Sequence, residues 1–195
     1  TNNSGGIIRS GAGDAISGEQ DTGDVTSGNT ITNSGTIFSD DQRAINFFSD
    51  ATTTTVTNNS SGHIYNSNTN ETIKLDTSST LTNSGKIENK NSADNNSVLL
   101  IGDNNTVTLK DSGLVIGTIG ASSGTSGNKL KIQHGIGQSY YYKTSGDFDL
   151  EDLDGNQIVK GSAGSVGQGG SETLDELLSY KTINLRNFFN SYTNS

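Results

Sequence analysis

The chain has 195 residues, of which 28% are hydrophobic and 17% charged, and its formal net charge is -9. This length suits one domain, and the acidic charge disfavours nucleic-acid binding through a basic patch and docking on anionic lipid. The absence of cysteine excludes disulfides and thiolate metal sites. No stretch approaches the ~20 apolar residues of a membrane helix, and no signal peptide is visible, so we expect any export signal to lie outside this segment.

Three short phrases recur along the chain. The first is Asn-Ser-Gly-x-Ile, as at residues 33–37, and its glycines stand at positions 5, 35, 62, 85 and 113, in steps of 30, 27, 23 and 28 residues. The second is a short apolar strand such as Ala44-Ile45, and the third is a Thr-rich strand such as residues 54–57. Because the phrases keep a common register over four periods, they predict a coil of parallel strands whose neighbouring turns stack.

The apolar residues of these phrases predict the interior of the coil, because alternate side chains of a strand face the same side. We expect three inward ladders: Ile7, Ile37, Ile64, Ile87 and Val115; Ile16, Ile45, Ile73 and Leu99; and Ile31, Val56, Leu81 and Val107. At the corners, Asn can adopt the left-handed conformation and Gly a positive φ. Stacked Asn side chains can also pair their amides along the axis.

Two further features of the repeats bear on function. The loops at residues 38–43 and 89–96 differ between coils, and they either carry binding specificity or merely tolerate insertion. The run Thr52 to Thr55 resembles the flat threonine arrays that bind ice. Such arrays repeat Thr-x-Thr on one face through every coil, and we interpret the threonine series here as irregular.

The repeat register weakens after about Gly117. Residues 129–132 alternate like a strand, and Asp154-Gly155 is typical of a hairpin turn, so we expect an antiparallel cap that closes the last coil. The acidic run at residues 147–154 is interpreted as a solvated loop, with calcium binding as the alternative. After a Gly/Ser-rich stretch, Thr173 and Glu176 fit a capping box that predicts a short terminal helix. The expected domains are therefore 1–128 (parallel β-helix rungs), 129–165 (β-rich cap) and 166–195 (linker with a short helix).

The sequence contains no recognisable set of catalytic residues. It contains no nucleophile elbow and no phosphate loop, and its two histidines, His63 and His134, stand far apart in the repeat register. We interpret His63 as an outward surface residue. We therefore expect no catalytic, cofactor-binding or metal site and no cofactor, we predict that the chain is not an enzyme, and we leave its ligand-binding residues unassigned.

The Asn-Ser-Gly-x-Ile phrases, the Thr-rich strands and the lack of Cys resemble the passenger domains of bacterial autotransporters (type V secretion) over roughly residues 1–135. Residues 136–195 are similar to the junction that precedes the membrane barrel in such proteins. The resemblance implies an all-β, right-handed parallel β-helix, export through the outer membrane to the bacterial surface or medium, and a translocator β-barrel elsewhere in the full-length chain.

The function that this resemblance implies is that of an adhesin or structural scaffold. Its partners would be host or bacterial surface glycans or proteins, or further copies of itself. Two alternatives remain open. A glycan-processing β-helix enzyme would show an acidic cluster from three consecutive coils on one face, and a toxin passenger that oligomerises at host membranes would show a broad exposed apolar patch.

Overall fold

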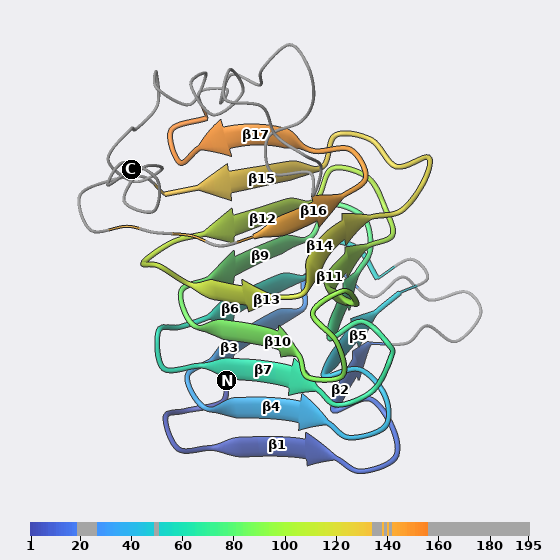
Figure 1. The fold of residues 1–195 in the computed structure, drawn as a ribbon, viewed down its shortest axis with the longest axis vertical. Helices are drawn as coiled ribbons and strands as arrows, with labels where there is room; N and C mark the ends of the chain where they lie inside the picture. The colour runs from blue at the N-terminus through green and yellow to red at the C-terminus, as the bar shows by residue number, and fades with distance from the viewer. Residues whose placement is uncertain (19–26, 49–50, 134–137, 139, 141, 156–195) are drawn as a thin grey trace.

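The computed structural model describes residues 1–18, 27–48, 51–133, 138, 140 and 142–155 (Figure 1). Within these ranges the chain forms seventeen short strands and no helix. None of the described residues therefore belongs to a helix that could span a membrane.

The strands form three parallel sheets, named here in the order in which the chain visits them. The first sheet contains β1 (Ile7–Ser10), β4 (Thr36–Ser39), β7 (His63–Asn66), β10 (Lys86–Asn89) and β13 (Leu114–Ile116). The second sheet contains β2 (Ile16–Gly18), β5 (Ile45–Phe47), β8 (Ile73–Leu75), β11 (Asn96–Leu100), β14 (Thr118–Ala121) and β16 (Lys143–Ser145). The third sheet contains β3 (Thr30–Asn33), β6 (Thr55–Asn58), β9 (Thr80–Asn83), β12 (Thr106–Leu109), β15 (Lys129–Ile132) and β17 (Asp149–Asp152).

One strand from each sheet makes one coil, and successive coils stack, so the predicted parallel β-solenoid is confirmed. In Figure 1 the first sheet runs from left to right at the front and the third sheet from right to left behind it, while the chain rises from β1 to β17. This path is a right-handed coil, the hand that parallel crossover connections strongly favour.

The first inward ladder is confirmed for Ile37, Ile64, Ile87 and Val115, which are fully buried and in register. The prediction for Ile7 was wrong, because its side chain is 69% exposed and Ile8 lies opposite Ile37. The cause is the corner that precedes β1. Asn2, rather than Asn3, pairs with Asn33, so this corner holds two more residues than the next one and moves the inward position to Ile8.

The second ladder needs one correction and the third needs none. Leu99 lies opposite Lys74 and is partly exposed, whereas the buried Val98 lies opposite Ile73. A register shift between Asn96 and Val98 causes this change of face. The third ladder, Ile31, Val56, Leu81 and Val107, is confirmed and is continued by Leu130 and Leu150.

The predicted antiparallel cap is not what the described residues after 128 form. β15, β16 and β17 pair in parallel with β12, β14 and β15, because Leu130 and Leu150 keep the inward phase of the third ladder. The acidic run is a strand rather than a solvated loop, since Asp149–Asp152 form β17 and Glu151 is buried. The segments 156–165 and 166–195, with the expected end of the cap, linker and helix, lie outside the described residues.

A ladder of buried Asn side chains joins the coils at the corner between the third and first sheets. The Nδ2 atoms of Asn2, Asn33 and Asn58 donate to the Oδ1 atoms of Asn33, Asn58 and Asn83 at 2.9, 2.9 and 2.8 Å. Asn83 ends the series by donating to the carbonyl of Leu114 at 3.2 Å. The predicted pairing of amides along the axis is thus confirmed.

The glycine that follows each ladder Asn at this corner is required because backbone atoms of the neighbouring coil approach it closely, and not because of its own backbone conformation. A Cβ atom on Gly35 would meet the carbonyl oxygens of Gly6 and Asn3, and one on Gly85 would meet those of Asn59 and Gly62. Positive φ was the expected reason, but Gly5 alone among the repeat glycines in the described chain has it, at 77°. The Asn ladder residues also have ordinary backbone angles.

Replacing Ile73 by Ala should lower the free energy of unfolding by roughly 2–5 kcal/mol, because it opens a cavity in a fully buried ladder. Lys74, the next residue, points outward and makes a 3.9 Å ion pair with Glu71. Lys74→Ala should cost about 1 kcal/mol or less. Denaturant titration checks both values, and equal sensitivity at the two positions would contradict the register.

Replacing Asn58 by Ala should break the amide ladder and cost about 1–3 kcal/mol for each buried polar group left without a partner. Its neighbour Asn59 is the matched control, since its side chain donates to Ser34 Oγ at 2.8 Å in a partly buried position. Asn59→Ala should cost only about 0.5–1.5 kcal/mol. Thermal unfolding of the two variants distinguishes a ladder that stabilises the coil from an Asn that merely occupies a turn.

Candidate functional site

The outer face of the first sheet carries the most varied chemistry among the three faces. Its strands place two files of side chains outward, because residues i and i+2 of a strand face the same side. In register, these files are Ile7, Thr36, His63, Lys86 and Leu114, and Arg9, Phe38, Tyr65, Glu88 and Ile116.

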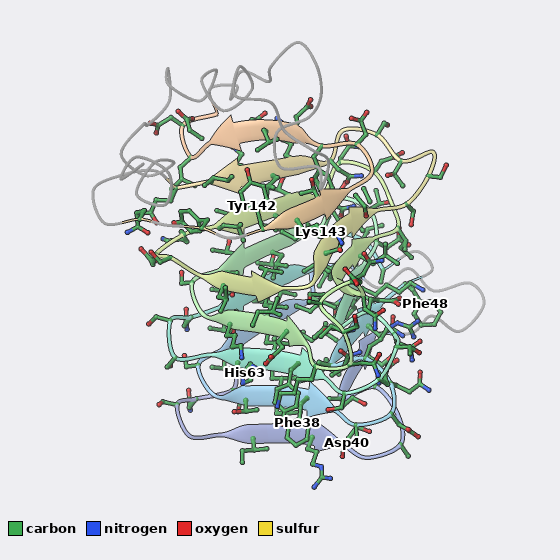
Figure 2. All side chains as sticks on the ribbon, in the orientation of Figure 1. Phe38, Asp40, Phe48, His63, Tyr142 and Lys143 are labelled. Atoms are coloured by element: carbon green, nitrogen blue, oxygen red, sulfur yellow. The ribbon has the colours of Figure 1, made fainter. Side chains whose placement is uncertain are left out.

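Phe38 and Tyr65 stack on this face, with ring centroids 4.7 Å apart and planes inclined by 10°. Parallel strands in register lie about 4.8 Å apart, so two aromatic side chains at equivalent positions meet face to face. The Arg9 guanidinium lies 5.3 Å from the Phe38 centroid, and Lys90 Nζ lies 3.3 Å from the Tyr65 centroid. We call these four residues, Arg9, Phe38, Tyr65 and Lys90, the cation–aromatic column; Figure 2 labels Phe38 within it.

A polar cluster borders the column. The His63 ring packs against Tyr65 with centroids 4.7 Å apart, and its Nε2 lies 3.1 Å from Glu88 Oε2. Lys86 Nζ lies 2.7 Å from the same carboxylate oxygen. Burial lowers the pKa of His63, and it outweighs the opposing hydrogen bond to Glu88. Burial alone would raise the pKa of Glu88, but the hydrogen bonds and charges of Lys86 and His63 bring it below its usual value.

Residues of the two variable loops contribute to this face. Asp40 accepts from Arg9 at 2.6 Å, and it belongs to the loop after β4. Lys90 belongs to the loop after β10. Both variable loops therefore contribute a side chain to the outer face of the first sheet.

The geometry limits what the column can bind. Both faces of each ring are occupied, by the other ring and by a cation, so a ligand meets ring edges and the Tyr65 hydroxyl rather than an open ring face. Arg9 pairs with Asp40 and Lys86 with Glu88, so Lys90 leaves one excess positive charge on this face of a chain whose formal net charge is -9. The surface therefore suits an anionic or polar partner, and Tyr and Arg are the residues most often dominant in such contacts.

His63 does point outward, as expected, but the sequence did not indicate its contacts with Tyr65 and Glu88. Arg9, Phe38 and Tyr65 were also missed as site residues. Each follows an inward isoleucine, so an alignment of the repeats on Ile8, Ile37 and Ile64 would have placed them in one file.

The sequence predicted no catalytic or metal site, with calcium binding by the acidic run as the alternative to a solvated loop. The described part of the chain contains no group of three or more His, Asp and Glu residues that could hold a metal ion. In the acidic run, Glu151 lies 2.7 Å from Lys129 Nζ and 3.3 Å from Lys131 Nζ. The hydrogen bond from Lys129, followed by that from Lys131, lowers the pKa of Glu151 despite its burial.

Comparison with protein-family models, with curated proteins and with solved structures finds no match to this chain.

The His63 pKa should lie below about 6.5 in the folded protein, and Glu88→Gln should lower it further, because the carboxylate favours the imidazolium. Since the folded pKa is depressed, the contribution of His63 to stability is complete above about pH 6.5 and declines as the pH falls below that value. An NMR titration of the ring, assigned with a His134→Gln variant, measures both pKa values. An unchanged or higher value in Glu88→Gln would contradict the contact.

Proposed function

We propose that this chain is part of a bacterial passenger region, displayed at the cell surface or secreted, that acts as an adhesin or structural scaffold. Its contact surface would be the outer face of the first sheet. A β-solenoid of about five coils supports the scaffold role, since stacked coils give a rigid, extended surface. The observation that carries the adhesive role is the cation–aromatic column, which crosses successive coils.

The column would be preorganised for binding, because the strands fix the positions of its side chains and the side chains pack against one another. Side chains that are already ordered lose less conformational entropy on binding, so more of the contact energy appears as affinity. Because Arg9 is paired with Asp40, the charge of Lys90 is what favours anionic partners, such as acidic surface glycans or carboxylates on proteins. Another copy of this chain, whose formal net charge is -9, also carries an excess of carboxylates, which makes self-association one form of the same contact.

The two alternatives lack a supporting observation in the described residues. On the first sheet, Glu88 is the one carboxylate in its outward file, so no acidic cluster spans three consecutive coils there. The large exposed apolar side chains, Ile7, Leu114 and Leu153, lie on different coils and make no broad patch.

The proposal includes export of the chain to the cell surface. Antibodies to the chain should therefore label intact producing cells without permeabilisation.

Beads coated with the chain should attach to epithelial cell monolayers or to one another through this column. An Arg9→Ser/Tyr65→Ser double variant should attach about tenfold less, because loss of one dominant contact pair costs about 1.4 kcal/mol. Thr108→Ser, on the outer face of the third sheet, is the matched control and should leave attachment unchanged. Equal attachment by the double variant, or none by the unaltered chain, would contradict the proposal.

A further inference from the structure

The outer face of the third sheet carries an ordered array of threonines. Its first four strands, β3, β6, β9 and β12, have the sequences TITN, TVTN, TLTN and TVTL. Each places two threonines outward around one buried apolar residue. The eight threonines, Thr30, Thr32, Thr55, Thr57, Thr80, Thr82, Thr106 and Thr108, form two files in unbroken register. We call them the threonine array.

The interpretation of the threonine series as irregular was therefore wrong. The first threonine of the array recurs after 25, 25 and 26 residues, which is more regular than the Asn-Ser-Gly spacing. Other threonines, such as Thr54 and Thr72, are buried at the corners and obscure the pattern when the chain is read in a line.

The array is uncharged and its hydroxyls are free to bind. No hydroxyl of the eight has a hydrogen-bond partner within the part of the chain that the structure describes, and all eight side chains are partly or fully exposed. The first charged side chains in the two files belong to the next coil, where Lys129 and Lys131 replace the two threonines and pair with Glu151.

The fold alone does not require two outward threonines on each of these strands. Threonine suits strands and pairs well with threonine on a neighbouring strand. The same would hold for the other two sheets, yet their outward positions carry residues as different as Phe38, Lys74 and Leu99. A uniform Thr-x-Thr face is therefore a particular property of the third sheet.

The spacing of the array is two-dimensional and fixed. Neighbouring strands lie about 4.8 Å apart, and alternate residues along a strand lie ~6.6 Å apart. The β-branched side chain is stiff about χ1, so each threonine presents its methyl and hydroxyl groups in a defined orientation. The four strands pair along their whole length without a register shift, so the array repeats regularly from coil to coil.

We propose that the threonine array binds ice. A threonine hydroxyl offers one donor and two acceptor positions, so it can both donate to and accept from the water molecules at an ice surface. Its methyl group orders the water beside it, and the array repeats in two directions, as the surface of a crystal does. A flat crystalline polysaccharide is another extended lattice of hydroxyls, but none of the four array strands carries an aromatic side chain that could pack against a sugar ring.

The test is uptake of the purified chain, labelled with a fluorescent dye, into a slowly growing ice hemisphere. The unaltered chain should enter the ice and slow recrystallisation of a frozen sucrose solution. A Thr57→Tyr/Thr82→Tyr double variant should lose both effects, because two bulky rings at the centre of the array prevent contact with a flat crystal. Thr36→Tyr, the same change at an outward position of the first sheet, should retain both.

Each outcome decides the proposal. Exclusion of the unaltered chain from ice, or retention of uptake by the double variant with a normal thermal unfolding curve, would overturn it. If the double variant fails to fold, Thr57→Ser/Thr82→Ser removes only the two methyl groups and should still reduce uptake. Binding of the unaltered chain to microcrystalline cellulose or chitin but not to ice would also overturn it and reassign the array to a polysaccharide.

Discussion

The rest of the structure depends on backbone hydrogen bonding between successive coils in constant register. The amide nitrogens of His63, Lys86 and Leu114 donate to the carbonyls of Gly35, Gly62 and Gly85 at 2.9, 2.9 and 2.8 Å. Each coil thus repeats the position of the one before it. A one-residue slip would move every inward side chain of a strand to the surface, so the apolar ladders and the hydrogen bonds select the same register.

Polar side chains inside the corners make this register more specific. The Asn ladder joins Asn2 to Asn83, and at the corner before the third sheet Asn105 donates to Asn128 Oδ1 at 3.1 Å. A buried amide without a partner is costly, so each of these residues stabilises a coil only when the neighbouring coil supplies the matching group. A narrow coil with few apolar residues can therefore still favour one arrangement.

Much of this fold could be predicted from the sequence because its strongest signal is periodic. Ile37, Ile64 and Ile87 repeat with their corner glycines, and burial follows directly from that period. The errors at Ile7 and Leu99 arose where a longer corner or a bulge changes which residue of the strand faces inward. The outward files that hold the cation–aromatic column and the threonine array follow from the same period once the repeats are aligned on their inward residues. The ring stacking and the cation contacts of the column do not, because they depend on side-chain conformations that the period does not determine.

Constant register also explains how one chain presents two chemically different surfaces. The first sheet gathers rings and cations, and the third sheet gathers uncharged hydroxyls, while the same apolar interior supports both.

A cysteine cross-link tests the register directly, because the chain has no cysteine of its own. Under mild oxidation, Thr82→Cys/Thr108→Cys should form a disulfide, since these residues are paired at about 4.8 Å. Thr82→Cys/Thr106→Cys should not, because its Cα atoms, offset by two residues, exceed the ~7 Å that a disulfide can bridge. Equal cross-linking of the two pairs, or cross-linking of the offset pair alone, would contradict the stacked parallel register.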